Sequence, residues 1–305
     1  MRQAFSKALV DAATRDERVL LLTGDHGYAL FDDFRKACPD QYINAGIAEQ
    51  NMVGVAAGLA KAGFRPVVYG LSAFVPVRVL EQIKIDVCYE ELPVIFIGDG
   101  AGLVYSTLGT SHQSFEDIAC LRAVPHVDIL SPCDAAETTA CMQAAFERQS
   151  PVYFRMGKSD VGTVHDKPLP GLRRGALLKV REGKGPVSFI ATGSMVRTAC
   201  NVAEASDATV WSAPWIHPLD EAQLAGIASR SRALVTFEEH SVRAGLGSAV
   251  VEHLAENAPM PVLRIGIGER FSTTCGSYAH ALREHGLDEA AIARRVQPFV
   301  TRFDR

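Results

Sequence analysis

The feature that most constrains the fold is a regular alternation of short, strand-like runs with longer helical segments. In the first half, apolar runs rich in branched residues occupy residues 19–23, 66–71, 93–99, 127–132 and 151–157. In the second half, similar runs occupy residues 187–193, 208–213, 233–239 and 261–268. Strands that alternate with helices form mostly parallel sheets whose two faces are covered by helices. The sequence therefore predicts an α/β fold.

The domain organisation follows from a change in composition near the middle of the chain. Residues 158–186 are rich in glycine, proline and charged residues, which is typical of a linker. We expect a first domain over residues 1–160, a linker over residues 161–186 and a second domain over residues 187–305. Each domain is predicted to contain a mostly parallel sheet flanked by helices.

Three helices of the first domain are predicted from local signals. The segment 49–62 is helical in pattern, and Gly63 is placed to end it. Its Gly54 and Gly58 lie on one face, which suits either close packing within the chain or tight contact with a partner chain or ligand. Residues 77–90 are expected to be helical, and Asp134 is placed to cap a helix over residues 134–149.

Composition and charge exclude several classes of protein. The net charge of −4 gives no reason to expect a nucleic-acid partner. No apolar run approaches the roughly 18 residues that a membrane span requires, and charged residues interrupt the N-terminal segment, unlike in a signal peptide. The seven cysteines are scattered without a C-x-x-C pair, which is typical of reduced thiols. We expect a cytoplasmic enzyme or enzyme subunit that has neither a nucleic-acid nor a membrane partner.

Common catalytic and metal-binding motifs are missing from the sequence. There is no phosphate-binding loop, no G-x-S-x-G nucleophile motif, and no Cys/His spacing that predicts a zinc site. The segment 244–250, AGLGSAV, has two of the three glycines of a dinucleotide-binding fingerprint and lacks the third. No metal-ligating residue is therefore predicted.

Three segments together resemble the transketolase family of thiamine diphosphate enzymes. The segment YINAGIAEQNMVGVAAGLAKAGFRPV (42–67) resembles the family's pyrimidine-binding domain. The segment LGTSHQSFEDIACLRAVPHVDILSPCDAAET (108–138) is similar to the family's substrate-histidine region, and VTFEEHSVRAGLGSAVVEHL (235–254) to its C-terminal domain. The resemblance covers nearly the whole chain, in the family's order.

The resemblance implies one subunit of a split enzyme. The family's Gly-Asp-Gly motif for diphosphate and Mg²⁺ is completed by a downstream asparagine, and none of the asparagines at 44, 51, 201 and 257 follows IGDGAG (97–102) at that distance. We therefore interpret Gly98-Asp99-Gly100 as a turn at a strand end. A separate subunit would supply the diphosphate-binding domain and bind most of the Mg²⁺, in an expected α₂β₂ assembly.

The resemblance assigns catalytic roles to Glu49 and His112. The family's acid in the G-I-x-E motif donates a hydrogen bond to the cofactor's aminopyrimidine, which activates the cofactor; Glu49 matches it. Donation requires a protonated carboxyl, and apolar neighbours such as Ile43, Ala45 and Ile47 would favour the neutral acid. His112 matches the family's substrate histidine, which exchanges a proton with a developing alkoxide.

Further residues are expected to complete the pocket. Either Leu71 or Phe74 would cover the pyrimidine, with core packing as the alternative for both. Arg155 matches a basic position that meets a substrate anion, although a structural ion pair is the competing interpretation. His26 could reach the substrate from another loop. The acidic pair beside His240, Glu238 and Glu239, is expected to be structural or part of an interface.

Two departures from the family pattern predict an unusual substrate. Leu108 replaces an acid that helps the family recognise a substrate hydroxyl, and a second histidine is lost near Gly100. We expect an enzyme that transfers a two-carbon ketol unit from a modified or phosphorylated ketose to an aldehyde. The alternatives are a β subunit of a 2-oxoacid dehydrogenase or decarboxylase, and a non-catalytic scaffold with the same fold.

Overall fold

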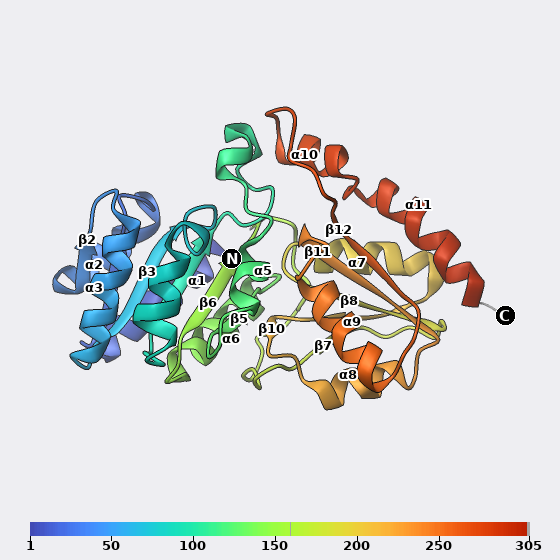
Figure 1. Ribbon diagram of the computed structural model, residues 1–305, viewed down its shortest axis with the longest axis horizontal. Coiled ribbons are helices and arrows are strands. Elements are labelled where there is room, and N and C mark those ends of the chain that lie inside the picture. The colour runs from blue at the N-terminus through green and yellow to red at the C-terminus, as the bar shows by residue number, and fades with distance from the viewer. Residues whose placement is uncertain (159, 304–305) are drawn as a thin grey trace.

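A computed structural model describes residues 1–158 and 160–303, and it contains two α/β domains that lie side by side (Figure 1). The predicted fold class is confirmed, because most neighbouring strands in both sheets are parallel. The two antiparallel exceptions are edge strands, β10 in the first sheet and β7 in the second.

The first sheet has seven strands in the order β10-β5-β6-β4-β3-β1-β2. Their bounds are β1 Val19–Thr23, β2 Tyr42–Asn44, β3 Arg65–Leu71, β4 Ile95–Asp99, β5 Asp128–Leu130, β6 Val152–Met156 and β10 Trp215–His217. Successive residues of β1 enter different cores: Leu21 packs with α1 and α6, and Leu22 packs with α3. Both faces of the sheet are therefore covered, which explains why its strands read as continuous apolar runs.

The second sheet has five strands in the order β12-β11-β8-β9-β7. Their bounds are β7 Leu178–Arg181, β8 Val187–Ala191, β9 Thr209–Ser212, β11 Ala233–Ser241 and β12 Val262–Ile267. The strand β7 lies within the segment expected to be a linker, and β10 of the second half joins the first sheet. The strand β10 thus completes the first sheet from the second half of the chain, and composition alone does not reveal this pairing between distant strands.

The described residues form eleven α-helices, and two of them lie close to the predicted segments 49–62 and 134–149. Their bounds are α1 Arg2–Arg15, α2 Asp32–Ala37, α3 Glu49–Lys61, α4 Leu80–Gln82, α5 Asp117–Arg122, α6 Ala135–Glu147, α7 Met195–Ala203, α8 Glu221–Ala228, α9 Leu246–Asn257, α10 Tyr278–His285 and α11 Glu289–Val300. The predicted cap of α6 is confirmed, because the Asp134 carboxylate accepts a hydrogen bond from the Glu137 amide at 3.0 Å.

The single helix expected over residues 77–90 is replaced by three short pieces. A 3₁₀ turn at Val77–Val79 leads into α4, and α4 leads into a wider π-helical segment at Ile83–Cys88. β-Branched residues recur through this stretch, and they favour regular α-helix less than straight-chain residues do. The difference places Arg78 at the start of this irregular segment.

The second sheet is also covered on both faces. The helices α7 and α11 pack on one face, around Phe189 and Phe237, and α9 packs on the other around Leu246 and Val250. Figure 1 shows α5 between the two domains. Among the described residues, no helix combines the length and apolar character needed to cross a membrane.

Candidate active site

Four loops of the first domain meet at one edge of its sheet. His26 follows β1, Glu49 follows β2, Phe74 follows β3, and His112 lies in the long loop after β4. These four strands are mutually parallel, so their carboxyl ends lie at the same edge. Ligands of open α/β sheets bind at this edge, in the crevice outside the strand ends. The topology therefore brings together four residues that sequence resemblance singled out.

The half-buried ring of Phe74 is the centre of this group. Its centroid lies 5.5 Å from that of the His112 ring and 6.1 Å from that of the His26 ring. The guanidinium carbon of Arg78 lies 4.0 Å from the same centroid. Two imidazoles and one cation thus surround a single aromatic ring at the sheet edge.

Glu49 begins α3, and its side chain is almost fully buried at 4% exposure. The expected burial is observed, but one expected neighbour is wrong, because Ile47 is 78% exposed and does not cover the carboxylate. The hydrogen-bond partner of the Glu49 carboxylate is Arg78, whose Nη1 donates to Oε1 at 2.9 Å. This buried acid is therefore paired with a cation in the isolated chain.

Several polar atoms near this group are buried without a hydrogen-bond partner. They include Nδ1 of His26, Oε1 of Gln82 and both amide atoms of Gln113. Gln82 lies one helical turn beyond Arg78, and Gln113 directly follows His112. A buried polar atom that has lost its water without gaining a partner is costly, so these atoms can take a hydrogen bond from water, a ligand or a partner group.

Phe74, rather than Leu71, lies at the centre of this group. Leu71 is the last residue of β3, and its carbonyl accepts a hydrogen bond from the Phe74 amide at 2.8 Å. This tight turn presents Phe74 to His26, Arg78 and His112. Leu71, which is partly buried, remains a candidate for the rim of the pocket.

Arg155 is placed in a structural ion pair rather than in an open pocket. It is 2% exposed, its Nε donates to Asp117 Oδ2 at 2.7 Å, and its Nη2 donates to the Glu239 carbonyl at 2.9 Å. Burial alone would raise the pKa of Asp117, but the Arg155 charge holds it below its usual value. Since Arg155 links the two domains, we do not retain it in the proposed substrate site.

The two departures at Leu108 and Gly100 have different structural settings. Leu108 is 54% exposed in the loop that leads to His112, where it presents an apolar side chain in place of the acid. Gly100 has φ of +73°, and a Cβ built there would lie 1.9 Å from Cε2 of Tyr105. No histidine fits at position 100 while Tyr105 keeps this place.

Gly98 and Asp99 are the last residues of β4, and the turn interpreted from the sequence begins at Gly100. The buried Asp99 carboxylate accepts hydrogen bonds from Arg2 at 2.6 Å, Tyr69 at 2.8 Å and Tyr105 at 3.1 Å. All three hydrogen bonds are accepted by Oδ2, so donors from this chain hold the Asp99 carboxylate in place.

The Glu238-Glu239-His240 segment is buried at the contact between the domains. Glu238 accepts hydrogen bonds from the Leu246 and Gly247 amides at 2.8 and 2.9 Å, and so fills the N-terminus of α9. Glu239 accepts a bond from the Leu103 amide at 2.6 Å. The backbone amides of the AGLGSAV segment therefore bind the Glu238 carboxylate of the same chain, which agrees with a structural role for Glu238, Glu239 and His240.

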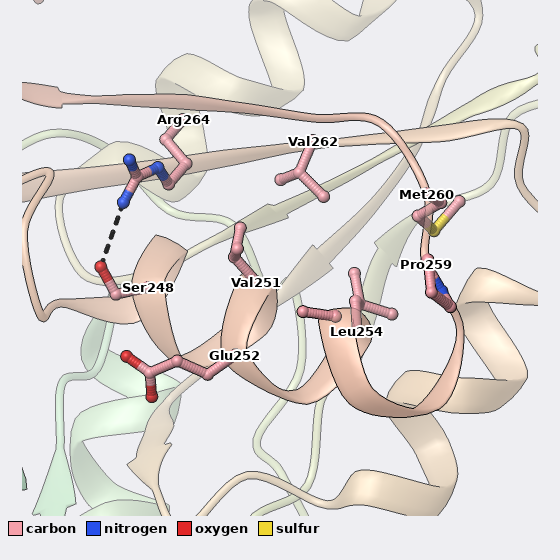
Figure 2. Close-up of a pocket in the computed structure, with 9 residues that line it drawn as sticks. Ser248, Val251, Glu252, Leu254, Pro259, Met260, Val262 and Arg264 are labelled. Carbon is pink, nitrogen blue, oxygen red and sulfur yellow. Dashed lines mark hydrogen bonds between the residues drawn. The ribbon is translucent and has the colours of Figure 1, made fainter.

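A groove of about 630 Å³ lies elsewhere, on the second domain between α9 and β12 (Figure 2). Its floor is apolar, and Arg264 lies at one end, where it donates a hydrogen bond to Ser248 at 3.1 Å. None of its lining residues belongs to the group around Phe74. We therefore base the candidate active site on convergent polar chemistry rather than on cavity size.

Sequence reasoning missed Arg78, Gln82 and Gln113. Each is a single polar residue in an otherwise ordinary segment, and its importance comes from a neighbour distant in the sequence, such as Glu49 for Arg78. A signal was present in the spacing of Arg78, four residues after Phe74, because residues four apart lie on the same face of a helical turn.

Comparison with known proteins places the chain in a family. The description "Transketolase, pyrimidine binding domain" matches residues 1–163, and "Transketolase, C-terminal domain" matches residues 175–292. The chain belongs to the transketolase family. The resemblance found in the sequence is thus confirmed.

Relatives of two kinds match most of the chain. One of the subunits of the apulose-4-phosphate transketolase of Phocaeicola vulgatus is 33% identical, over 98% of this chain and 97% of the relative. The 1-deoxy-D-xylulose-5-phosphate synthases of Chlorobium luteolum and Methylibium petroleiphilum are 38% and 37% identical, over 98% and 96% of this chain. The alignments cover 48% and 47% of these synthases, so the chain spans about half their length.

Solved structures of the transketolase family give the same result. A protein described as "Split gene transketolase, inactive beta4 tetramer" is 35% identical, with a TM-score of 0.88 over 100% of this chain and 98% of that one. Transketolase from Leishmania mexicana has a TM-score of 0.81 over 100% of this chain and 46% of its own, at 18% identity, which shows the fold alone. The chain is a homologue of separately encoded transketolase subunits.

Proposed function

We propose that this chain is the pyrimidine-binding subunit of a split, thiamine diphosphate-dependent transketolase. The enzyme would move a two-carbon ketol unit from a phosphorylated or modified ketose to an aldehyde. The observation that carries the proposal is the convergence of buried Glu49 with Phe74, His112 and His26 at one sheet edge. The relative named as a transketolase subunit, which matches along nearly its full length, supports a separate-subunit arrangement.

The residues present fit the aminopyrimidine part of the cofactor. Glu49 offers a buried carboxyl, Phe74 offers a ring face, and unpartnered atoms of His26, Gln82 and Gln113 can accept or donate hydrogen bonds. Bound thiamine diphosphate would supply the nucleophilic carbon and the electron sink of the reaction. Glu49 would hold the ring by donating a hydrogen bond from its protonated carboxyl, so Arg78 must first release it.

His112 and His26 are proposed to act on the substrate. Both imidazoles lie near the Phe74 ring, and they come from different loops. His112 can donate a proton to an alkoxide oxygen, or remove one from the corresponding hydroxyl, since histidine titrates near neutral pH. Leu108, which stands in place of an acid, offers no hydrogen-bond acceptor from its side chain, which supports a deoxygenated or otherwise modified substrate rather than a fully hydroxylated one.

Several surface features support assembly with other subunits. Beside the site, Ile47 is 78% exposed and Tyr28 is also 78% exposed. A Cβ added at Gly54 or Gly58 would meet nothing within 4 Å, so these glycines do not serve packing within the chain. We propose that a diphosphate-binding subunit covers this side and holds most of the Mg²⁺, in an α₂β₂ enzyme. The seven cysteines are unpaired, which supports a reducing, cytoplasmic location.

Reconstitution with the partner tests this function. The chain would be co-purified with the product of the adjacent gene and assayed with thiamine diphosphate, Mg²⁺ and a panel of ketoses, aldehydes and 2-oxoacids. Transfer of a two-carbon unit from a ketose to an aldehyde supports the proposal. Decarboxylation of 2-oxoacids without ketose cleavage would instead identify a subunit of a 2-oxoacid-decarboxylating enzyme. If the reconstituted enzyme kept its activity after Glu49 was replaced, this chain would be a non-catalytic scaffold.

A further inference from the structure

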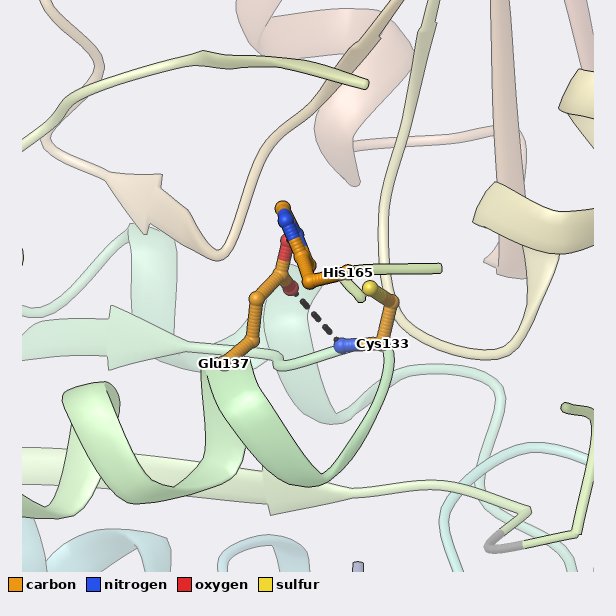
Figure 3. A group of neighbouring side chains, drawn as sticks. All are labelled: Cys133, Glu137 and His165. Atoms are coloured by element: carbon orange, nitrogen blue, oxygen red, sulfur yellow. Dashed lines mark hydrogen bonds and ion pairs between the residues drawn. The ribbon is translucent and has the colours of Figure 1, made fainter. Parts of the chain in front are cut away.

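A second group of reactive side chains lies apart from the Phe74 group. Cys133 immediately precedes the cap of α6, Glu137 lies in the first turn of α6, and His165 comes from the segment that joins the two domains (Figure 3). Their sulfur, oxygen and nitrogen ligand atoms all lie within 4.8 Å of one another. The proposed transfer reaction uses none of these three residues.

The three side chains are held in place by their surroundings. Glu137 Oε1 lies 2.8 Å from His165 Nε2, and Glu137 Oε2 accepts a hydrogen bond from the Cys133 amide at 2.8 Å. The neighbouring Asp134 accepts hydrogen bonds from the Val164 and His165 amides at 2.9 and 2.8 Å, which fixes the backbone that carries the imidazole. A preorganised ligand set of this kind needs little rearrangement to bind an ion.

We propose that Cys133, Glu137 and His165 form a binding site for a divalent transition-metal ion of the zinc type. Thiolate, carboxylate and imidazole are the ligands that zinc takes in proteins, and three of them leave a fourth position for water. The thiolate and the carboxylate together neutralise a 2+ charge. On binding, the Cys133 thiol proton is released to solvent, and the ion replaces the hydrogen bond between His165 and Glu137. The proton on His165 Nε2 leaves that nitrogen, either to Nδ1 through solvent or, from a charged imidazole, to solvent.

The environment of the site supports a cation. Cys133 and Glu137 are buried, and the partly exposed His165 side chain, at 13%, provides the side from which an ion enters. The Ser212 hydroxyl is fully buried beside the Cys133 thiol without a good hydrogen-bond partner among the described residues, and it can bond to a metal-bound water. Since 28 residues separate Glu137 from His165, a bound ion would fasten the interdomain segment to the first domain.

The sequence did not reveal this site. The spacing of 133, 137 and 165 does not match the paired motifs of structural zinc sites, and the third ligand lies in a segment expected to be a linker. Its position became evident only when the fold placed residues 164–165 against the N-terminus of α6.

Cobalt and zinc binding to the full-length chain test the proposal. Co²⁺ bound by a thiolate gives a near-ultraviolet charge-transfer absorption, and displacement by Zn²⁺ gives the relative affinity. We expect one ion per chain, and a loss of the absorption with at least tenfold weaker binding in C133S. The variant H165Q should also weaken binding at least tenfold while folding normally, as judged by circular dichroism.

Control variants distinguish this site from adventitious binding. C275S removes the exposed cysteine and should leave the absorption unchanged, as should C200S. In a thermal-melt arm, Zn²⁺ should raise the melting temperature of the wild type and C275S but not of H165Q. Absence of the cobalt absorption in the wild-type chain overturns the proposal, and so does an absorption that survives in C133S or disappears in C275S.

Discussion

Arg78 contacts the two residues on which the proposed cofactor site depends. Its Nη1 lies 2.9 Å from Glu49 Oε1, and its guanidinium carbon lies 4.0 Å from the centroid of the Phe74 ring. A flat, cationic group thus covers the aromatic ring and donates to the buried acid at once. A bound aminopyrimidine would contact the same two residues, with its ring on Phe74 and a ring nitrogen accepting a hydrogen bond from Glu49, so Arg78 and the cofactor compete for them.

The first prediction concerns this competition. R78Q in the reconstituted enzyme should bind thiamine diphosphate about 2–5-fold more tightly, because a half-exposed ion pair of roughly 0.2–1 kcal/mol no longer has to be broken. Titration of intrinsic fluorescence with cofactor measures the dissociation constant. R35Q, which alters another surface ion pair, is the control. Weaker binding by R78Q would show that Arg78 assists the cofactor instead.

The second prediction separates Phe74 from Leu71. F74A should weaken cofactor binding about tenfold, because an aromatic contact of roughly 0.5–1.5 kcal/mol and the apolar cover of the ring are both lost. F74L should lose less, since it keeps most of the apolar cover. L71A should have a smaller effect than F74A, and the opposite order in the same fluorescence titration would move the stacking role to Leu71.

The third prediction concerns the buried ion pair between Arg155 and Asp117. R155M should lower the free energy of unfolding by about 3–5 kcal/mol, because the fully buried Asp117 charge loses its partner. Replacing both partners, in D117N/R155M, should restore part of that loss. Urea denaturation measures both effects. If Arg155 instead bound substrate, R155M would raise KM without this loss of stability.

The fourth prediction is a pH dependence carried by His240. Burial is the main cause that lowers the pKa of His240 to about 4, with Arg155 acting in the same direction and Asp117 against it. Its Nε2 accepts a hydrogen bond from the Ala119 amide at 3.3 Å, and its Nδ1 lies 2.8 Å from the Ser241 carbonyl oxygen, which fits the neutral tautomer.

Because the folded-state pKa lies below the usual value of 6.5, the contribution of His240 is complete above pH 6.5 and is lost as the pH falls through about 4. This shift corresponds to roughly 3 kcal/mol. H240Q keeps one donor and one acceptor but cannot be charged, so its stability should fall less than that of the wild type between pH 7 and pH 4. Equal slopes for both proteins in urea denaturation series would contradict this account.

Much of the fold could be predicted because buried parallel strands have a strong sequence signature. Runs such as 19–23 are apolar on both faces, and β1 occupies that range, while the Asp134 cap matches a local rule. Pairings between distant segments could not be predicted. The antiparallel addition of β10 to β5 depends on how the two halves dock, and that of β7 to β9 brings a segment expected to be a linker into the second sheet. The helix at 77–88 is irregular because its apolar pattern favours a helix, whereas its β-branched residues have low helix propensity.

The sequence could identify site residues that belong to a motif. It could not identify residues whose role depends on neighbours that are distant in the sequence. Glu49 and His112 were assigned by resemblance, and strand order explains why His26 and Phe74 join them. Arg155 offered two interpretations from the sequence, and the structure favours the ion pair because the side chain is buried against Asp117. Arg78 was missed because a lone arginine carries no motif, although it donates the hydrogen bond that pairs the Glu49 carboxylate with a cation.

The role of Glu49 is the central claim of this account, and one substitution tests it most directly. E49Q keeps the size and the hydrogen-bonding capacity of the side chain but cannot exchange a proton. In the reconstituted enzyme, with E90Q as a matched surface control, E49Q should lower the turnover of ketol transfer by about 10²–10⁴-fold while subunit assembly is preserved. Turnover within twofold of the wild type, with assembly intact, would contradict the assignment of this site.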